Sequence, residues 1–211
     1  MIVDEIAQTL RPFLGTNPIS QEQLGRTVAY LDLLLKWNAR INLSAIRSPE
    51  EIVTRHFGES FFAARHLLWK DNHPGSAIDI GSGAGFPGLP MKIWAPSLGL
   101  TLIESNGRKA TFLREVCRAL HLSGVEVVSK RAEDVEARAD LVTVRAVERF
   151  DSVLPIAERL MSSSGTLALL IGAAQEETAK RVLPKLKWQD PLPIPLSQSR
   201  MLLVGVRSAE A

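Results

Sequence analysis

Residues 76–90, with the sequence SAIDIGSGAGFPGLP, decide the fold of this chain. The stretch opens with a short apolar run that predicts a strand, and glycines then recur at every second position from Gly81 to Gly85. Pro90 follows in the first turn of a predicted helix, where the missing N–H of proline costs nothing. Because glycine lets the backbone approach a ligand and a helix N-terminus offers free N–H groups, the stretch predicts a ligand-binding loop between a strand and a helix.

The glycines can be read in two registers. The first, Gly83-x-Gly85-x-x-Gly88, satisfies the dinucleotide fingerprint and would indicate a NAD-dependent oxidoreductase. The second, Asp79-x-Gly81-x-Gly83-x-Gly85, resembles motif I of the S-adenosylmethionine (SAM) methyltransferases. The second register is favoured, since the first glycine belongs at the end of the strand and Gly81 takes that place. A tight turn without any ligand is the remaining alternative.

Length and composition predict one α/β domain with a small appendage. The chain has 211 residues, of which 45% are hydrophobic, so a packed core is expected. Its single cysteine, Cys117, cannot form an internal disulfide, and no apolar run approaches the roughly 20 residues that a membrane-spanning helix needs. We therefore expect a cytoplasmic protein without a membrane partner, acting as a monomer. The net charge of +2 is too small to indicate a nucleic-acid binder, so any RNA-binding surface must be local.

The chain divides into two regions by its hydrophobic pattern. Residues 1–72 carry apolar side chains at spacings of three and four and predict an N-terminal helical extension. Residues 73–211 alternate strand and helix patterns, which predicts a mostly parallel seven-stranded sheet flanked by helices. In the tail, prolines stand at every second position from Pro191 to Pro195, a spacing that fits only an edge strand or an extended segment. We expect the tail to form an antiparallel hairpin at the edge of the sheet.

Polar residues stand where the predicted strands end, and ligands of open α/β sheets bind at these carboxyl ends. Glu104 ends the second strand and could accept hydrogen bonds from both hydroxyls of a ribose. After the third strand, a backbone N–H and the acid Glu133 could read the edge of an adenine, or this turn could be a plain helix cap. Arg145 ends the fourth strand, where it could meet a carboxylate or a phosphate, or form a structural ion pair.

Several other kinds of site are not indicated. The sequence contains no Gly-Lys-Ser/Thr of a P-loop, and Ser82 does not stand in the Gly-x-Ser-x-Gly elbow of hydrolases. One cysteine and four scattered histidines are too few and too far apart for a zinc site, so no metal is expected.

Short matches to one known family run in order from about residue 30 to residue 172. They are Trp37-Asn38 with Asn42-Leu43-Ser44, Arg55-His56, the run 79–90, Glu104-Ser105 with Arg108-Lys109, Phe112-Leu113-Arg114, Arg131-Ala132-Glu133-Asp134 and Val144-Arg145-Ala146. By these stretches the chain resembles the small-subunit ribosomal RNA guanine-N7 methyltransferase G family, also called glucose-inhibited division protein B. Residues 86–90, FPGLP, separate this family from other methyltransferases. The chain departs from the family at Ile171-Gly172, where members often carry Lys-Gly.

The resemblance implies a Rossmann-like class I methyltransferase fold with SAM as the cofactor. It places SAM contacts at Gly81, Phe86, Ala132, Glu133 and Arg145. Together with motif I and the predicted ribose acid, the cofactor-binding candidates are Asp79, Gly81, Gly83, Gly85, Phe86, Glu104, Ala132, Glu133 and Arg145.

The resemblance also implies a substrate, N7 of a guanine in 16S rRNA or in the small ribosomal subunit. Because N7 carries a lone pair and no proton, we expect no catalytic acid or base, and Arg145 is a candidate for positioning the substrate. Basic residues at the same rim are candidates for RNA contacts: Arg55, Arg108, Lys109 and Arg149. A SAM-dependent methyltransferase of a small molecule or protein, a NAD-dependent oxidoreductase and a non-catalytic RNA-binding protein remain alternatives.

Overall fold

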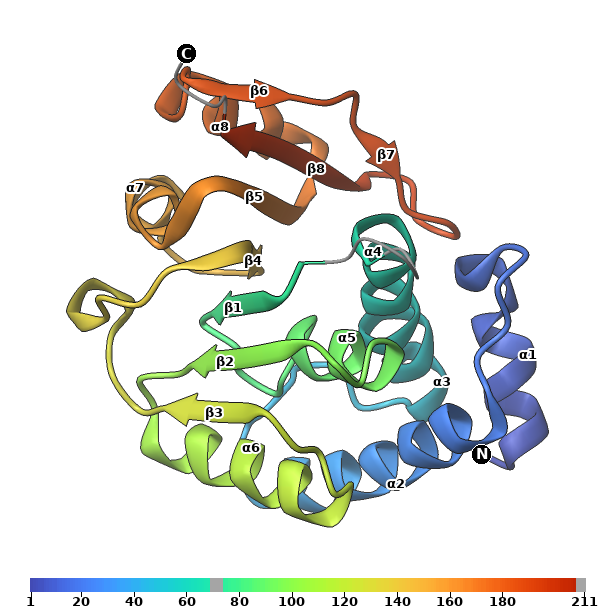
Figure 1. Ribbon diagram of the computed structural model, residues 1–211. Coiled ribbons are helices and arrows are strands. Elements are labelled where there is room, and N and C mark those ends of the chain that lie inside the picture. Colours follow the sequence, from blue (N-terminus) through green and yellow to red (C-terminus); the bar gives the residue numbers. More distant parts are fainter. Residues whose placement is uncertain (69–73, 208–211) are drawn as a thin grey trace.

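The computed structural model describes residues 1–68 and 74–207. Its first part is helical, as predicted: α1 (Val3–Leu14), α2 (Gln21–Asn38), α3 (Pro49–Ile52), the π-helical segment η1 (Val53–Gly58) and α4 (Glu59–Leu67) (Figure 1). Ser20 caps α2, because its Oγ accepts a hydrogen bond from the Gln23 N–H while the Gln23 side chain accepts one from the Ser20 N–H.

Strands and helices alternate from residue 76 onward. They are β1 (Ser76–Ile80), α5 (Gly88–Trp94), β2 (Gly99–Ile103), α6 (Gly107–Ala119), β3 (Val125–Val128), η2 (Ala132–Asp134), β4 (Ala139–Arg145), α7 (Phe150–Arg159), β5 (Met161–Gly172), η3 (Ala173–Gln175), α8 (Glu176–Val182), β6 (Leu186–Trp188), β7 (Leu192–Pro193) and β8 (Arg200–Arg207).

These strands form one sheet in the order β3-β2-β1-β4-β5-β8-β6, with β7 paired beside β8. The first five strands are parallel, and β8 runs antiparallel to its neighbours, so the prediction of a mostly parallel sheet is confirmed. The sheet has eight strands instead of the predicted seven, because the proline-rich tail adds the two-residue strand β7 opposite Met201 and Leu202. The strand order reverses at β1, which is where open α/β sheets bind their ligands.

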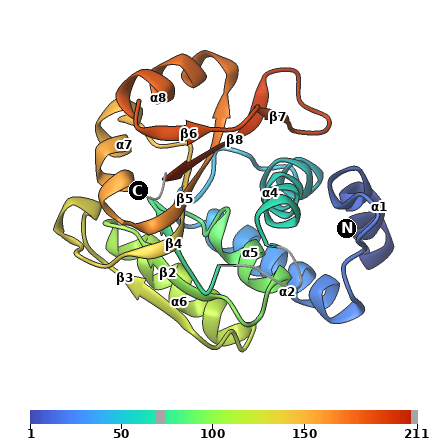
Figure 2. The ribbon, with the colours of Figure 1, turned by 45° about the horizontal axis from the view of Figure 1, so that its top comes forward.

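Alternate residues of the central strands face two hydrophobic clusters. Ala77 and Leu141 belong to the larger cluster, with the apolar faces of α1, α2, α4, α5 and α6, whereas Ile78 and Val142 belong to the smaller one with α7 and α8. Figure 2 shows α7 and α8 on the opposite side of the sheet from α2 and α4. The N-terminal helices therefore pack on the same core as the sheet, while the boundary predicted between residues 72 and 73 lies outside the described residues.

Candidate active site

The glycine loop leaves β1 directly after Ile80, so Gly81 is the first residue beyond the strand, as the methyltransferase register requires. Gly81, Gly83 and Gly85 have φ values of +65°, +56° and +92°, a region that disfavours side chains. At Gly85 an added Cβ would also lie 2.3 Å from the Tyr30 hydroxyl oxygen. Backbone conformation and close packing therefore both require glycine at residue 85.

Tyr30 of α2 supports this loop. Its buried hydroxyl donates a hydrogen bond to the Ala84 carbonyl, and burial raises the pKa of Tyr30 well above its usual value, so the hydroxyl keeps its proton. The Tyr30 ring stacks on Phe86 with centroids 5.3 Å apart, and the His56 ring also stacks on Phe86 at 4.8 Å. Sequence reasoning missed Tyr30, although it is the only tyrosine of the chain and a buried tyrosine hydroxyl needs a partner.

Replacing Tyr30 by phenylalanine is expected to lower stability and weaken SAM binding. The change leaves the buried Ala84 carbonyl without its donor, and an unsatisfied buried group costs about 1–3 kcal/mol. Thermal unfolding measures the stability, and calorimetric titration with SAM measures the affinity. The control is Thr111→Val, which removes an exposed hydroxyl that donates to the Gly107 carbonyl. Equal losses of stability and of SAM affinity in the two variants would contradict a supporting role for Tyr30.

A cavity of about 370 Å³ opens beside the loop, at the carboxyl ends of β1 to β4. This volume lies within the roughly 300–1,000 Å³ of small-molecule sites. Four predicted cofactor contacts line the cavity together: Gly81, Glu104, Ala132 and Glu133. Lysine and arginine side chains also lie at its wall, namely Lys130, Arg131 and Arg149.

Glu104 joins the glycine loop to the start of α6. Its Oε2 accepts a hydrogen bond from the Gly83 N–H at 2.8 Å, and its Oε1 accepts one from the Asn106 N–H at 2.7 Å. A carboxylate offers about four acceptor positions, so each oxygen keeps one for a further donor. The arrangement fits the pair of hydroxyl donors that a ribose presents.

The turn η2 forms the far wall, and α7 holds it in place. Arg159 Nη2 donates to the carbonyls of Ala132 at 3.0 Å and Glu133 at 3.1 Å, and its Nη1 donates to the Val135 carbonyl at 2.7 Å. This contact could not be predicted from the sequence, because Arg159 lies 26 residues from Glu133.

Asp79 lies beneath the loop rather than in the cavity lining. Its side chain is 1% exposed, Oδ1 accepts a hydrogen bond from the Thr143 hydroxyl at 2.7 Å, and Oδ2 faces the Gly88 backbone without a hydrogen bond of good geometry. Burial raises the pKa of Asp79 to about 6, against the opposing effect of the Thr143 hydrogen bond. Its role as a cofactor contact stays a prediction.

Asp79 is expected to make stability fall as pH rises. The pKa in the folded state is raised from 3.8 to about 6, so its favourable contribution is complete below pH 3.8 and is lost as pH rises through about 6. The loss is about 3 kcal/mol for about two pKa units. Urea unfolding of the parent and of Asp79→Asn between pH 4 and pH 8 checks this. The stability of the parent relative to the variant should fall up to about pH 6 and then stay level, whereas a constant difference would contradict the burial effect.

Arg145 of β4 forms the structural ion pair that the sequence left as an alternative. Its side chain is 8% exposed, and Nη2 lies 3.1 Å from Glu59 Oε2. The same Nη2 donates to the Arg55 carbonyl at 2.7 Å and to His56 Nδ1 at 3.1 Å. Arg200 reaches the same Glu59 oxygen at 2.8 Å. Glu59 was not among the predicted site residues.

The tautomer of His56 follows from its partners. A guanidinium only donates, so Nδ1 accepts from Arg145 and Nε2–H donates to the Ser44 hydroxyl at 2.7 Å. Burial, and then the charge of Arg145, lower the pKa of His56 to about 3, so the ring is neutral at physiological pH. His56, in η1 of the N-terminal extension, thus contacts β4 through Arg145, the segment after α2 through Ser44, and the glycine loop through Phe86.

The predicted RNA contacts lie at the same end of the sheet. Arg149 lines the 370 Å³ cavity, Arg108 and Lys109 stand in the first turn of α6 just after Glu104, and Arg55 lies in η1. Arg55, Arg108 and Arg149 are exposed and Lys109 is half-buried. At the departure from the family pattern, Ile171 is buried against the α7 and α8 cluster, and Arg200 pairs opposite Gly172.

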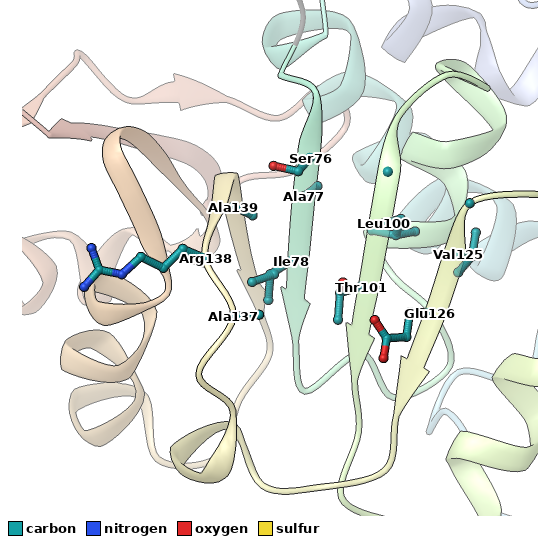
Figure 3. Close-up of a pocket in the computed structure, with 12 residues that line it drawn as sticks. Ser76, Ala77, Ile78, Leu100, Thr101, Val125, Glu126, Ala137, Arg138 and Ala139 are labelled. Atoms are coloured by element: carbon teal, nitrogen blue, oxygen red, sulfur yellow. The ribbon is translucent and has the colours of Figure 1, made fainter.

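A different hollow, of about 390 Å³, lies toward the amino ends of β1, β2 and β3 (Figure 3). Ser76, Gly99 and Val125, each the first residue of its strand, line it. The chain between β3 and β4 forms only the short turn η2, and the hollow lies on the sheet beside this connection. Because the glycine loop and Glu104 do not line it, we place the functional site at the opposite ends of the strands.

The family model described as rRNA small subunit methyltransferase G matches residues 23–189, which include every strand end of the 370 Å³ cavity. The chain belongs to the rRNA small subunit methyltransferase G family. A member of this family from Xylella fastidiosa (strain 9a5c), named Ribosomal RNA small subunit methyltransferase G, is 40% identical over 184 residues, or 85% of this chain and 84% of the relative. The family predicted from the sequence is confirmed.

Solved structures with low sequence identity share the fold. The ribosomal protein L11 methylase of Lactobacillus delbrueckii subsp. bulgaricus has a TM-score of 0.61 at 13% identity, covering 74% of this chain and 80% of its own. M. jannaschii TYW2 in complex with AdoMet has a TM-score of 0.55 at 16% identity, covering 80% of this chain and 78% of its own. These likenesses confirm the Rossmann-like class I methyltransferase fold predicted for the family.

The described part of the chain offers neither a membrane span nor a cluster of metal ligands. No helix in residues 1–68 and 74–207 has the length and apolar character to cross a membrane. Within the same ranges, no group of three His, Cys, Asp or Glu side chains could hold a metal ion.

Proposed function

We propose that this protein transfers a methyl group from SAM to N7 of a guanine in the 16S rRNA of the small ribosomal subunit. The observation that carries the proposal is the family match over residues 23–189, because that range includes the glycine loop and the strand ends around it. The Xylella relative carries a name that describes methylation of small-subunit ribosomal RNA.

The residues around the 370 Å³ cavity suit SAM. Gly81 presents no side chain, and an added Cβ would approach Val147 Cγ1 to 3.3 Å, so glycine keeps this wall open. Glu104 offers free acceptor positions to the ribose hydroxyls, and the turn at Ala132 and Glu133 provides backbone groups for the adenine. Phe86 is buried between Tyr30 and His56, and we propose that it acts by fixing the loop.

For this reaction the protein has to orient SAM and the guanine, and it does not have to transfer a proton. When bound, SAM supplies a methyl group on a sulfonium, and the N7 lone pair forms the new bond while the electron pair of the broken S–C bond stays on sulfur. Because N7 carries no proton, no side chain has to act as a base. Orientation alone can contribute about 7–11 kcal/mol to such a step. We assign Arg145 to positioning, since it touches His56, which stacks on Phe86.

The basic rim suits an RNA partner. We propose that Arg55, Arg108, Lys109 and Arg149 contact RNA phosphates, with an affinity that falls as salt rises. We further propose that the protein acts as a cytoplasmic monomer, without a metal ion or a membrane.

Transfer of tritium from labelled SAM tests the function. Small subunits and free 16S rRNA, both lacking the modification, are offered as separate substrates, and the labelled base is mapped. We expect one N7-methylguanine in rRNA. Label in a ribosomal protein, or in no RNA although SAM binds in calorimetry, would contradict the proposal and favour a different methyl acceptor.

A further inference from the structure

A second cavity, of about 540 Å³, lies at the carboxyl end of β5. Its wall combines η1, through Thr54 and Arg55, with Gly172 and with the loop that joins β7 to β8. In Figures 1 and 2 this loop lies beside α1 and α4. The glycine loop and Glu104 do not line this cavity, so it is distinct from the proposed cofactor site.

The charge at this cavity is not balanced. Glu59 and Arg200 both line it, and the single carboxylate of Glu59 serves two guanidinium groups, those of Arg145 and Arg200. The side chains of Glu59 and Arg145 are 3% and 8% exposed and that of Arg200 is 20% exposed, so this cluster carries one net positive charge and meets water mainly through Arg200. An uncompensated charge in such a place favours an anionic ligand.

Several donors of the same cluster lack an acceptor. Among the described residues, the buried Nε atoms of Arg145 and Arg200 have no hydrogen-bond partner. Arg200 Nη2 lies 2.8 Å from Glu59 Oε2 but also lacks a partner in hydrogen-bond geometry. Buried donors without acceptors are costly. Of the two arginines only Arg200 lines the cavity, so a ligand with acceptor oxygens would meet the Arg200 guanidinium there.

The lining indicates a phosphate rather than a base. Guanidinium N–H groups match phosphate oxygens, and Gln175 and Ser199 add neutral polar groups around Arg200. Stacking of a base needs an exposed aromatic face. Phe13 is the aromatic residue of the lining, but it is fully buried, and its ring lies against Gly58, where an added Cβ would be 2.6 Å away.

The cavity shares the carboxyl edge of the sheet with the glycine loop, because β4 alone separates β5 from β1. We propose that it binds a backbone phosphodiester of the RNA substrate, near the nucleotide that is methylated, with Arg200 as the main contact. This inference rests on the proposed function. η1, which carries the proposed RNA contact Arg55, supplies one wall of this cavity.

Filter binding of an unmodified 16S rRNA transcript, from 50 to 300 mM KCl, tests the inference. Ser199→Glu places a negative charge on an exposed side chain of the lining, and Arg200→Gln removes the phosphate contact. We expect each to raise the Kd for rRNA about tenfold at 150 mM KCl and to reduce the salt slope by about 0.7–0.9, the value of one phosphate contact. The Kd for SAM should not change.

Two controls make the same charge changes elsewhere. Ser164→Glu lies near the amino end of β5, and Arg181→Gln lies on the exposed part of α8. Both variants should bind rRNA with the same affinity, and the same dependence of affinity on salt, as the parent. Because Ser199 is exposed, Ser199→Glu keeps the test valid even if Arg200→Gln disturbs the Glu59 pair.

The outcomes separate the two proposals. If the parent methylates rRNA but Ser199→Glu and Arg200→Gln bind it unchanged, or no more weakly than the controls, the phosphate site is refuted while the function stands. If the parent binds SAM but methylates no rRNA, the proposed function fails and the phosphate site fails with it.

Discussion

Gly85→Ala is expected to abolish methyl transfer and to lower the free energy of unfolding by about 3 kcal/mol, through overpacking and backbone strain together. An added Cβ would lie 2.3 Å from the Tyr30 hydroxyl oxygen and 2.5 Å from Leu89 Cδ1, and the residue has a φ of +92°. Neither neighbour can retreat easily, because both are fully buried. Urea unfolding measures the stability, and calorimetry measures the loss of SAM binding.

Gly25→Ala is the matched control. Gly25 lies within α2, where an added Cβ would meet nothing within 4 Å. Alanine is favoured over glycine in a helix by about 1 kcal/mol, so this variant should be slightly more stable than the parent. A Gly85→Ala protein that binds SAM with the affinity of the parent would show that the loop is not built as the structure describes.

Glu59→Gln is expected to lower the free energy of unfolding by about 3–5 kcal/mol, the usual penalty for removing one partner of a buried ion pair. The glutamine keeps the size of the side chain but removes the only carboxylate that pairs with Arg145 and Arg200 in the described part of the chain. Two guanidinium groups would then remain without a counter-charge. Chemical denaturation at neutral pH measures the change.

An exposed pair provides the comparison. Glu22 forms an ion pair with Arg26 at 2.8 Å, and its side chain is 74% exposed. Glu22→Gln should therefore cost less than about 1 kcal/mol. If both variants lowered the free energy of unfolding by the same small amount, Glu59 would not be the buried counter-charge of Arg145 and Arg200.

Local signals in the sequence predicted the glycine loop, Glu104 and the parallel sheet. The loop depends on glycines within a few residues of one another, and Glu104 follows directly from the end of β2. Tyr30 and Glu59 were missed because their partners are far along the chain: Ala84 is 54 residues from Tyr30, and Arg145 is 86 residues from Glu59. Only the tertiary packing brings these pairs together.

Asp79 shows a signal that the sequence did contain. Side chains of a strand alternate between the two faces of the sheet. Ile78 and Ile80 face the α7 and α8 cluster, so Asp79 between them must point to the other face, toward Gly88 of α5. Its position near a strand end therefore did not place its carboxyl group in the cavity. Strand β7 has two residues, too few for an alternating pattern to be recognised in the sequence.

The hydrogen bond from Tyr30 to Ala84 bears on how far the protein can be trimmed. A fragment reduced to the sheet and its flanking helices would keep every backbone group of the glycine loop and would still lose the support beneath it. The ring of Phe86, now covered by Tyr30 and Phe57, would face solvent. The smallest working unit of this enzyme therefore includes α2 and η1, and the sheet with its flanking helices would not function by itself.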